Sequence, residues 1–343
     1  MSLKIGMVFA DLPQEGKKPG GVSVVIHELA NALVRAKNFV RIYTYSSKPH
    51  DALYEVVNLK PLINMKLSRR LFLPFQLIFL DYQDLDLLHL HGEDWAYLKR
   101  DIPTIRTFHG CSLNEAQFAD NLKSKFIFKV YHYLEILARK LANLSVGIGD
   151  DTVALLDVKH IIYNGYTKAL YYPPQHKANK PTAIVIGTLQ GRKQSILAIE
   201  LLLKIKKEIP ELVIHAVVDQ PYNHPDVNNW IGVSSEKLAQ LTRDSWIGVS
   251  TTLYEGFGIY YLEWMASGTI PVTFENVGIK NLIKNYQAGI FCEDTNDMYH
   301  KVLSILQNSS SRIAYSRNAI TASKSLSWDG IAEEYIKFYS QLM

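Results

Sequence analysis

Cysteine is almost absent from this chain, which holds only Cys111 and Cys292 among its 343 residues. Two cysteines so far apart give no disulfide framework of the kind that holds small secreted domains together. Residues 4–9 form a strand-like apolar run without the longer apolar stretch and cleavage site of a secretory signal peptide. The sequence therefore predicts a cytoplasmic protein.

Long apolar runs and strong net charge are missing as well. No uncharged run reaches the roughly 18 apolar residues that a membrane-spanning helix needs. A formal net charge of +4 is too small to indicate a nucleic-acid partner. We therefore expect no nucleic acid among the partners, while a peripheral contact with the inner membrane surface stays open.

The sequence does contain a regular alternation of short apolar runs and amphipathic stretches, which predicts an α/β fold with parallel sheets between helices. The expected strands are residues 4–9, 40–45, 85–91, 104–108, 144–148, 183–187, 213–218, 246–250, 270–274 and 289–291. The expected helices are residues 23–36, 126–142, 196–209, 236–243, 259–266, 280–284, 297–307 and 328–342.

A polar, proline-rich stretch at residues 172–181 interrupts this alternation and suits a hinge. Two domains of roughly 150 residues each fit the chain length. We expect one Rossmann-like domain over residues 1–172 and a second over residues 173–327, facing each other across a cleft. Ligands of open α/β sheets bind beyond the carboxyl ends of the strands, so functional residues are expected there.

The most informative segment is residues 254–268, which follow an expected strand and open a helix. Gly256 and Gly258 allow close backbone approach, and the free N–H groups of a first helical turn suit a diphosphate. Glu255 and Glu263 would repel phosphate but can accept hydrogen bonds from hydroxyl groups. A ligand with a sugar, a diphosphate and a ribose satisfies all of these groups. The alternative of a helix-terminal charge and a surface glutamate leaves the glycines unexplained.

This segment resembles the E-x7-E motif, in its E-G-F-G form, of the retaining glycosyltransferases of family 4, which have the GT-B fold. Further segments resemble the family's motifs in the same order: G-G-V at 20–22, T-F-H-G at 107–110, N-G at 164–165, G-T-L-Q-G-R-K at 187–193 and S-W-D at 327–329. The resemblance covers nearly the whole chain. It implies the GT-B arrangement of two Rossmann-like domains, with the final helix, residues 328–343, crossing back to the first.

The resemblance also implies roles in binding a nucleotide-sugar donor. Glu255 would contact hydroxyls of the donor sugar, and Glu263 the ribose diol. Phe257 and Gly258, beside Gly256, would offer backbone N–H groups to sugar and phosphate.

Three further positions complete the implied site. Lys193 would neutralise the diphosphate as the leaving group gains charge. His109 would reach the sugar from the first domain, and Gly21 would cap the phosphates.

Two positions depart from the family's pattern. Thr188 stands where the family usually has arginine, and Arg192 is the nearby substitute. Asn281 stands where the family often has glutamate. These departures keep open a catalytically impaired binding protein derived from a transferase, beside a sugar-nucleotide epimerase of the same fold.

The implied reaction moves a sugar to a hydroxyl of a glycan or a lipid-linked acceptor with retention of configuration. Retaining enzymes of this fold work without a metal, with the donor phosphate taking the acceptor proton. We therefore expect no cofactor and no metal, since the nucleotide-sugar is a substrate.

Several other patterns admit ordinary structural explanations. Asp84 and Asp86 form a D-x-D pair that suits a metal in another glycosyltransferase fold, but they precede an expected strand here. His89 is expected in the core, whereas for His91 a core position and the acceptor cleft stay equally open. His109 stands at a strand end before glycine, which favours a function.

Two stretches, residues 66–72 and 123–129, interleave cations with apolar residues. Such stretches can rest on an anionic membrane surface, where lipid-linked acceptors are found. An ordinary helix with one solvated face explains them slightly better.

Overall fold

The computed structural model describes residues 2–14, 20–60, 66–95, 97–98, 101–119, 121–275 and 278–343, without the side chains of residues 66–71. The chain forms two compact units, one of Met1–Gly165 with Trp328–Met343 and one of Tyr166–Ser327. The division therefore falls after residue 165, whereas the proline pattern placed it after residue 172.

Unit 1 is built on a seven-stranded sheet in which every strand pair is parallel, with the order β3-β2-β1-β4-β5-β6-β7. Its strands are β1 Lys4–Val8, β2 Phe39–Thr44, β3 Glu55–Asn58, β4 Leu87–Leu90, β5 Thr104–Phe108, β6 Leu144–Gly147 and β7 His160–Ile161. Strands β4 and β5 are fully buried, as is β1 apart from Lys4, because helices cover the sheet. The edge strands β3 and β7 are short, and the sequence pattern did not predict them.

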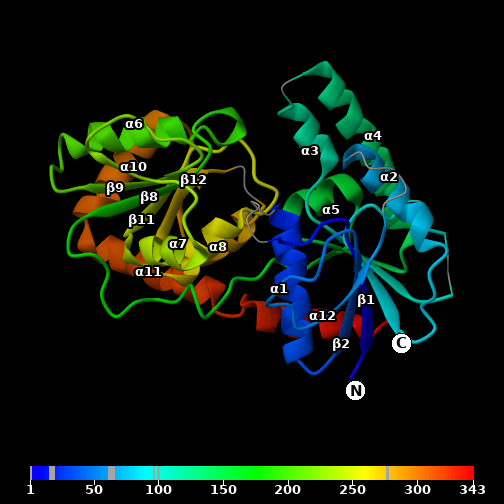
Figure 1. The fold of residues 1–343 in the computed structure, drawn as a ribbon. Coiled ribbons are helices and arrows are strands. Elements are labelled where there is room, and N and C mark those ends of the chain that lie inside the picture. The colour runs from blue at the N-terminus through cyan, green and yellow to red at the C-terminus, as the bar shows by residue number, and fades with distance from the viewer. Residues whose placement is uncertain are drawn as a thin grey trace. The chain divides into compact units, whose positions relative to one another are not determined.

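The helices of unit 1 are α1 Gly21–Arg35, α2 Lys66–Leu77, α3 Ser112–Gln117, α4 Leu122–Leu141, α5 Asp150–Leu156 and α12 Trp328–Tyr339. Helix α12 packs along α1 (Figure 1). Its Tyr335 and Tyr339 are buried, and they hydrogen-bond to Thr107 and His89 respectively. The C-terminal helix is therefore part of the core of unit 1.

Unit 2 has a six-stranded parallel sheet with the order β10-β9-β8-β11-β12-β13. Its strands are β8 Thr182–Gly187, β9 Val213–Val218, β10 Val227–Trp230, β11 Ile247–Ser250, β12 Ile270–Phe274 and β13 Ile290–Cys292. Only β10, the edge strand, was missing from the expected set.

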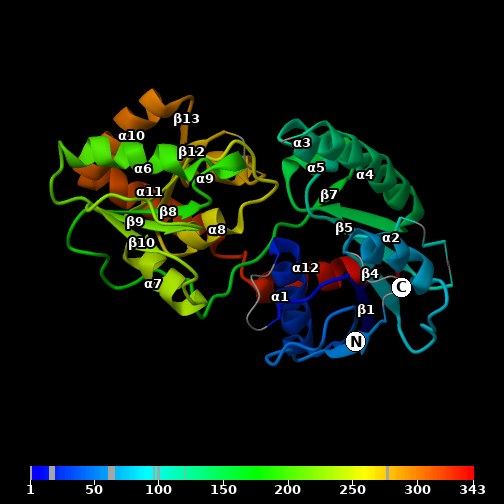
Figure 2. The ribbon, with the colours of Figure 1, turned by 45° about the horizontal axis from the view of Figure 1, so that its top comes forward.

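The helices of unit 2 are α6 Ser195–Lys206, α7 Ser235–Asp244, α8 Ile259–Ala266, α9 Lys280–Tyr286, α10 Thr295–Gln307 and α11 Ser309–Ser323. Helices α6 and α10 cover one face of the sheet, and α7, α8 and α11 cover the other (Figures 1 and 2). A Cβ atom on Gly248 of β11 would lie 2.3 Å from the Trp264 ring of α8. This glycine therefore lets α8 pack tightly on the strand.

The set of expected helices lacked α2, α3, α5 and α11, although an ordinary helix was one explanation given for residues 66–72 of α2. Two of them are very short, and α11 buries only Ala319, Ala322 and Ser323, so its apolar stripe is too weak to read. No helix among the described residues is long and apolar enough to cross a membrane.

Candidate functional site

In the sheet of unit 2 the strand order reverses between β8 and β11. Strands β9 and β10 are added on one side of β8, and β12 and β13 are added on the far side of β11. Ligands of such sheets bind where the strand order reverses, beyond the carboxyl ends. The loops that leave these two strands, residues 188–194 and 251–258, hold most of the site residues expected from the sequence.

Charged side chains from these two loops meet. The Nζ atom of Lys193 lies 3.1 Å from Oε1 of Glu255, and Nη1 of Arg192 lies 3.6 Å from Oε2 of the same carboxylate. The carboxylate side chain is only 12% exposed, so these cations compensate its burial. Lys193 also lies over the ring of Tyr260, with Nζ 4.6 Å from the centroid. The arrangement keeps two cations at one carboxylate.

Backbone hydrogen bonds fix the two loops against each other. The N–H of Leu253 donates to the carbonyl of Arg192 over 2.9 Å, and the hydroxyl of Thr251 donates to the carbonyl of Gln194 over 2.7 Å. Arg192 also donates to the carbonyl of Tyr254. By contrast, Thr188 turns back to its own loop and donates to the carbonyl of Gln190 over 2.8 Å. Arg192, and not Thr188, is therefore the second polar residue at Glu255.

Glycine is required where the loop enters helix α8. Gly258 has a φ of +76°, and a Cβ atom there would lie 2.5 Å from the Tyr261 ring. The backbone of Gly256 is met by Gly278, whose N–H donates to the carbonyl of Glu255 over 2.9 Å. Phe257 is buried and anchors the loop between the two glycines. A helix N-terminus leaves leading N–H groups without intrahelical partners. In the first turn of α8, the N–H of Tyr261 already donates to the carbonyl of Gly258 over 2.9 Å.

Glu263 lies within α8 and is partly buried. It accepts a hydrogen bond from the phenol of Tyr171, and burial together with this carboxylate raises the pKa of Tyr171. Tyr171 is buried and immediately precedes the proline-rich stretch. The adjacent backbone is also held, because Arg243 donates to the carbonyl of Leu170.

In unit 1, three histidines stack at the carboxyl ends of β4 and β5. His91 Nδ1 lies 3.1 Å from His109 Nε2, and the His89 and His91 rings are 3.9 Å apart between centroids. Both ring nitrogens of His89 have partners, at 2.7 Å from Tyr339 Oη and 2.8 Å from Thr107 Oγ1. His89 is therefore a core histidine, as expected.

The chemical state of these histidines is set by burial. Burial lowers the pKa of His109 to about 3, and the charge of Arg106 adds to the effect. Burial also lowers the pKa of His89 and His91 well below the ordinary value. His91 Nε2 and His109 Nδ1 have no hydrogen-bond partner among the described residues. The pair is therefore neutral at physiological pH and offers two unused nitrogens.

Gly21 opens helix α1 and is exposed. A Cβ atom there would meet no atom of the described residues within 4 Å, and the φ of Gly21 lies outside the left-handed region. Neither packing against the described residues nor backbone conformation therefore requires glycine at this position.

Comparison with known proteins assigns both units. Residues 19–167 match the family model described as Glycosyltransferase Family 4, and residues 172–322 match the one described as Glycosyl transferases group 1. The sucrose-phosphate synthase of Thermosynechococcus elongatus superposes with a TM-score of 0.75 at 18% identity, covering 99% of both chains. The chain belongs to the GT-B glycosyltransferases.

Other similarities agree with this family. Anabaena HepE, solved in complex with UDP and glucose, has a TM-score of 0.74 at 15% identity over 99% of this glycosyltransferase and 100% of that chain. MJ1178, an uncharacterized glycosyltransferase of Methanocaldococcus jannaschii, is 24% identical over 287 residues, 77% of each protein. A GDP-Man:Man(3)GlcNAc(2)-PP-Dol alpha-1,2-mannosyltransferase of Dictyostelium discoideum is 25% identical over 114 residues, 33% of this chain and 23% of that protein.

Asp84 and Asp86, the D-x-D pair considered as metal ligands in the sequence, form hydrogen bonds within unit 1. Asp84 accepts two hydrogen bonds from the Arg41 guanidinium, at 2.8 and 3.0 Å, and Asp86 accepts one from the backbone N–H of Lys4 at 2.7 Å. The D-x-D pair therefore holds the start of β4 against β1 and β2.

Sequence reasoning missed two tyrosines of the site. Tyr260 lies under Lys193, and Tyr171 binds Glu263. No motif marks Tyr171, because its partner lies 92 residues away in the sequence. Tyr260 lies within the E-x7-E segment, but only the fold shows that its ring faces the lysine.

Proposed function

We propose that this glycosyltransferase moves a sugar from a nucleotide-sugar donor to a hydroxyl acceptor with retention of configuration. The observation that carries the proposal is the meeting of Lys193, Arg192 and Glu255 beside the first turn of α8. Cations and free helix N–H groups suit the donor diphosphate, and the carboxylate suits sugar hydroxyls. Glu263 then accepts from the ribose diol.

In the proposed reaction the acceptor oxygen forms a bond to the anomeric carbon on the face from which the diphosphate leaves. The bond from that carbon to the phosphate oxygen breaks, and the acceptor proton passes to the leaving phosphate. Lys193 stabilises the charge that develops on the diphosphate, an effect worth several kcal/mol at a buried site. His109 and Gly21, on unit 1, are assigned to the sugar and the phosphates.

The same charges support transfer without a metal ion. Lys193 and Arg192 already lie at the carboxylate, so a divalent cation there would meet two like charges. The cations supply the positive charge that Mg²⁺ supplies in other phosphate sites.

For the donor we propose a UDP-sugar or a GDP-sugar. HepE was solved with UDP and glucose, and the Dictyostelium relative is named for GDP-mannose. Arg192 lies at Glu255 and supplies a second cation there, whereas Thr188, at the family's usual arginine position, carries no charge. This arrangement favours an active enzyme over an impaired binding protein.

Thermal unfolding with UDP, GDP and ADP, each with EDTA or magnesium, tests the proposal. A nucleotide at about 100 times its dissociation constant adds roughly 2.7 kcal/mol of apparent stability. We expect one nucleotide to stabilise the wild type equally under both conditions, and Glu263→Ala to lose most of the effect. Release of free sugar from the matching donor then reports catalysis. Absence of any nucleotide response would overturn the proposal.

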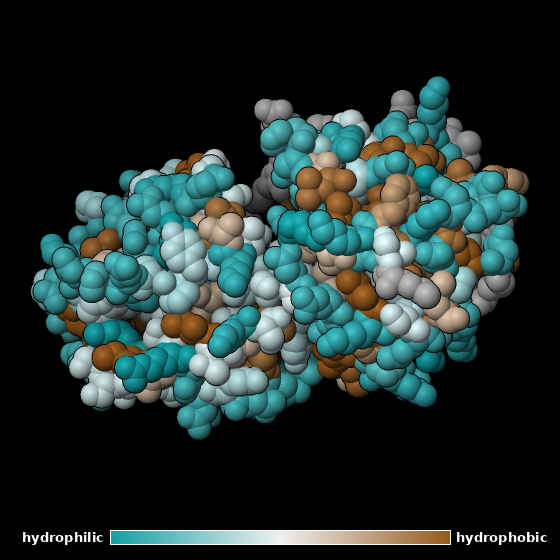
Figure 3. Space-filling model, turned by 90° about the horizontal axis from the view of Figure 1, so that it is seen from below, coloured by the Kyte–Doolittle hydropathy of each residue, from teal (hydrophilic) through white to brown (hydrophobic). Residues whose placement is uncertain are grey.

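We propose further that helix α4 rests on an anionic membrane surface, where a lipid-linked acceptor is found. Figure 3 shows exposed apolar areas among hydrophilic surface on one face of the molecule, and α4 carries a stripe of its own. The stripe consists of Leu122, Phe126, Val130, Tyr133 and Leu137, all at least 42% exposed.

The spacing and charge of α4 support this contact. Positions 122, 126, 130, 133 and 137 follow the helical period and share one face. The other exposed side chains of the helix are Lys123, Lys125, Lys129 and Lys140. An apolar stripe flanked only by lysines suits acyl chains beneath anionic headgroups.

A further inference from the structure

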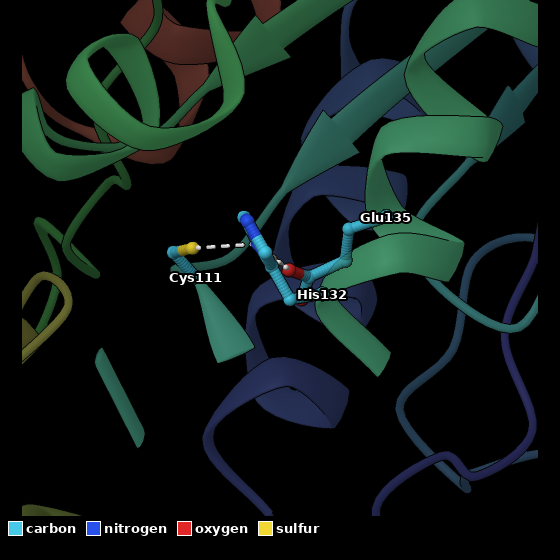
Figure 4. A group of neighbouring side chains, drawn as sticks. All are labelled: Cys111, His132 and Glu135. Atoms are coloured by element: carbon cyan, nitrogen blue, oxygen red, sulfur yellow. Dashed lines mark hydrogen bonds and ion pairs between the residues drawn. The ribbon is translucent and has the colours of Figure 1, made fainter. Parts of the chain in front are cut away.

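Cys111, His132 and Glu135 form a cluster in unit 1 that the proposed sugar transfer does not use. Cys111 follows β5 and precedes α3, whereas His132 and Glu135 lie one turn apart on α4. The three side chains point toward one another, with the imidazole of His132 next to both the thiol and the carboxylate (Figure 4). One ligand atom from each residue lies within 4.8 Å of the other two.

Two of the three distances in this cluster are close to those between ligands of one small cation. The sulfur of Cys111 lies 3.5 Å from Nδ1 of His132, and that nitrogen lies 3.7 Å from Oε2 of Glu135. Bond lengths of about 2.3 Å to sulfur and about 2.0 Å to nitrogen and oxygen at tetrahedral angles place such pairs about 3.5 Å and about 3.3 Å apart. Small side-chain shifts therefore suffice to close the site.

The carboxylate is already held in place. Ser112 donates to Glu135 from its backbone N–H at 3.1 and 3.2 Å and from its hydroxyl at 2.5 Å. Oxygen Oε2 remains next to His132. Hydrogen bonds of this kind orient the ligands of metal sites and lower the cost of assembling them.

Charge and access also fit. A thiolate and a carboxylate together offset the two positive charges of a zinc ion. Cys111 is buried, but the His132 and Glu135 side chains are 13% and 18% exposed, which leaves a route from solvent.

We propose that Cys111, His132 and Glu135 bind one Zn²⁺ ion through sulfur, Nδ1 and a carboxylate oxygen, with water as the fourth ligand. On binding, the thiol of Cys111 loses its proton to solvent, and no electron is transferred. Mixed sulfur, nitrogen and oxygen ligands in a tetrahedral set favour zinc over magnesium or calcium. The ion ties the segment after His109 to α4, so its role is structural.

Cobalt titration of the full-length chain, with any tag removed, tests the site. We expect metal-stripped protein to develop a thiolate-to-cobalt charge-transfer band and the visible bands of tetrahedral Co²⁺, saturating at one ion per chain. Zn²⁺ should bleach both bands and release one proton per ion near neutral pH. Zinc alone should also raise the unfolding temperature without any nucleotide.

Cysteine variants provide the matched control, since Cys292 is the other buried cysteine and lies in β13. Cys111→Ser should abolish the charge-transfer band, whereas Cys292→Ser should keep it. Glu135→Gln, whose amide oxygen still accepts from Ser112, should fold and bind zinc at least tenfold more weakly. A wild type without the band, or a band that persists in Cys111→Ser, overturns the proposal. Neither result depends on donor binding, so the two proposals stand or fall separately.

Discussion

The ammonium of Lys193 lies 3.1 Å from the carboxylate of Glu255, which joins the loop after β8 to the loop after β11. Each residue offsets the burial cost of the other in the free protein. In the proposed function, a diphosphate bound beside α8 would engage the lysine as well, and the pair is already positioned in the free protein.

Replacement of this lysine should reduce transfer strongly. We expect Lys193→Met to lower the transfer rate by at least about 100-fold, because a cation that stabilises developing charge is lost. The measurement is kcat with the donor that the thermal screen identifies. Lys204→Met, on the exposed face of the following helix α6, is the matched control and should keep the wild-type rate. Equal rates in both variants would remove Lys193 from the site.

The hydrogen bond from Tyr171 to Glu263 predicts an effect on nucleotide affinity. Tyr171→Phe leaves the carboxylate less firmly oriented, and a loss of about 1 kcal/mol weakens nucleotide binding about fivefold. Isothermal titration measures the change. Tyr172→Phe is the control, since this neighbour is 45% exposed and stacks on Arg243. If both variants bind as the wild type does, Tyr171 has no positioning role.

Replacement of Gly21 should affect activity without reducing stability. Gly21→Ala adds a methyl group that meets no atom of the described residues within 4 Å, so the free energy of unfolding should stay the same or rise by up to about 1 kcal/mol. If Gly21 approaches the donor phosphates, the transfer rate should nevertheless fall at least about tenfold. Urea unfolding and kcat/KM on the same preparation distinguish the two effects. A variant with full activity would contradict the assigned role.

Acid should destabilise unit 1 through its buried histidines. The pKa of His109 is about 3 in the folded protein and about 6.5 in the unfolded chain, so the unfolded chain binds more protons between these values. The stability present at neutral pH is therefore lost as the pH falls from about 6.5 toward about 3.

Each such histidine contributes a slope of about 1.4 kcal/mol per pH unit in that window. His109→Gln should reduce the slope by that amount in urea unfolding series at several pH values. His50→Gln should not, because the His50 side chain is 96% exposed. An unchanged slope in His109→Gln would mean that His109 takes up its proton without unfolding.

The stripe on α4 predicts salt-dependent binding to vesicles. Wild-type protein should pellet with anionic vesicles at low salt and be released at high salt. The double variant Phe126→Ser with Tyr133→Ser should bind at least about tenfold more weakly, since two exposed aromatic rings are lost. Ile231→Ser, at a 51% exposed position in unit 2, is the control. Failure of the wild type to pellet at low salt would remove the membrane proposal.

Much of the fold was predictable, because buried parallel strands are continuous apolar runs and need no partner to be recognised. The misses have a common cause. The edge strand β3 has no buried residue, and α11 buries only small side chains, so neither leaves a clear pattern. The site loops were also predictable, because glycines beside glutamates have few structural explanations.

The sequence by itself determined the α/β alternation and the glycine-containing loop that opens α8, since each depends on neighbours along the chain. Only the tertiary structure revealed the contact of Arg192 with Glu255 and that of Tyr171 with Glu263. It also revealed the cluster of Cys111, His132 and Glu135. The same holds for Tyr339, which closes the core at His89 from 250 residues away. Such pairs depend on how helices and sheets pack, and local sequence patterns carry no record of that packing.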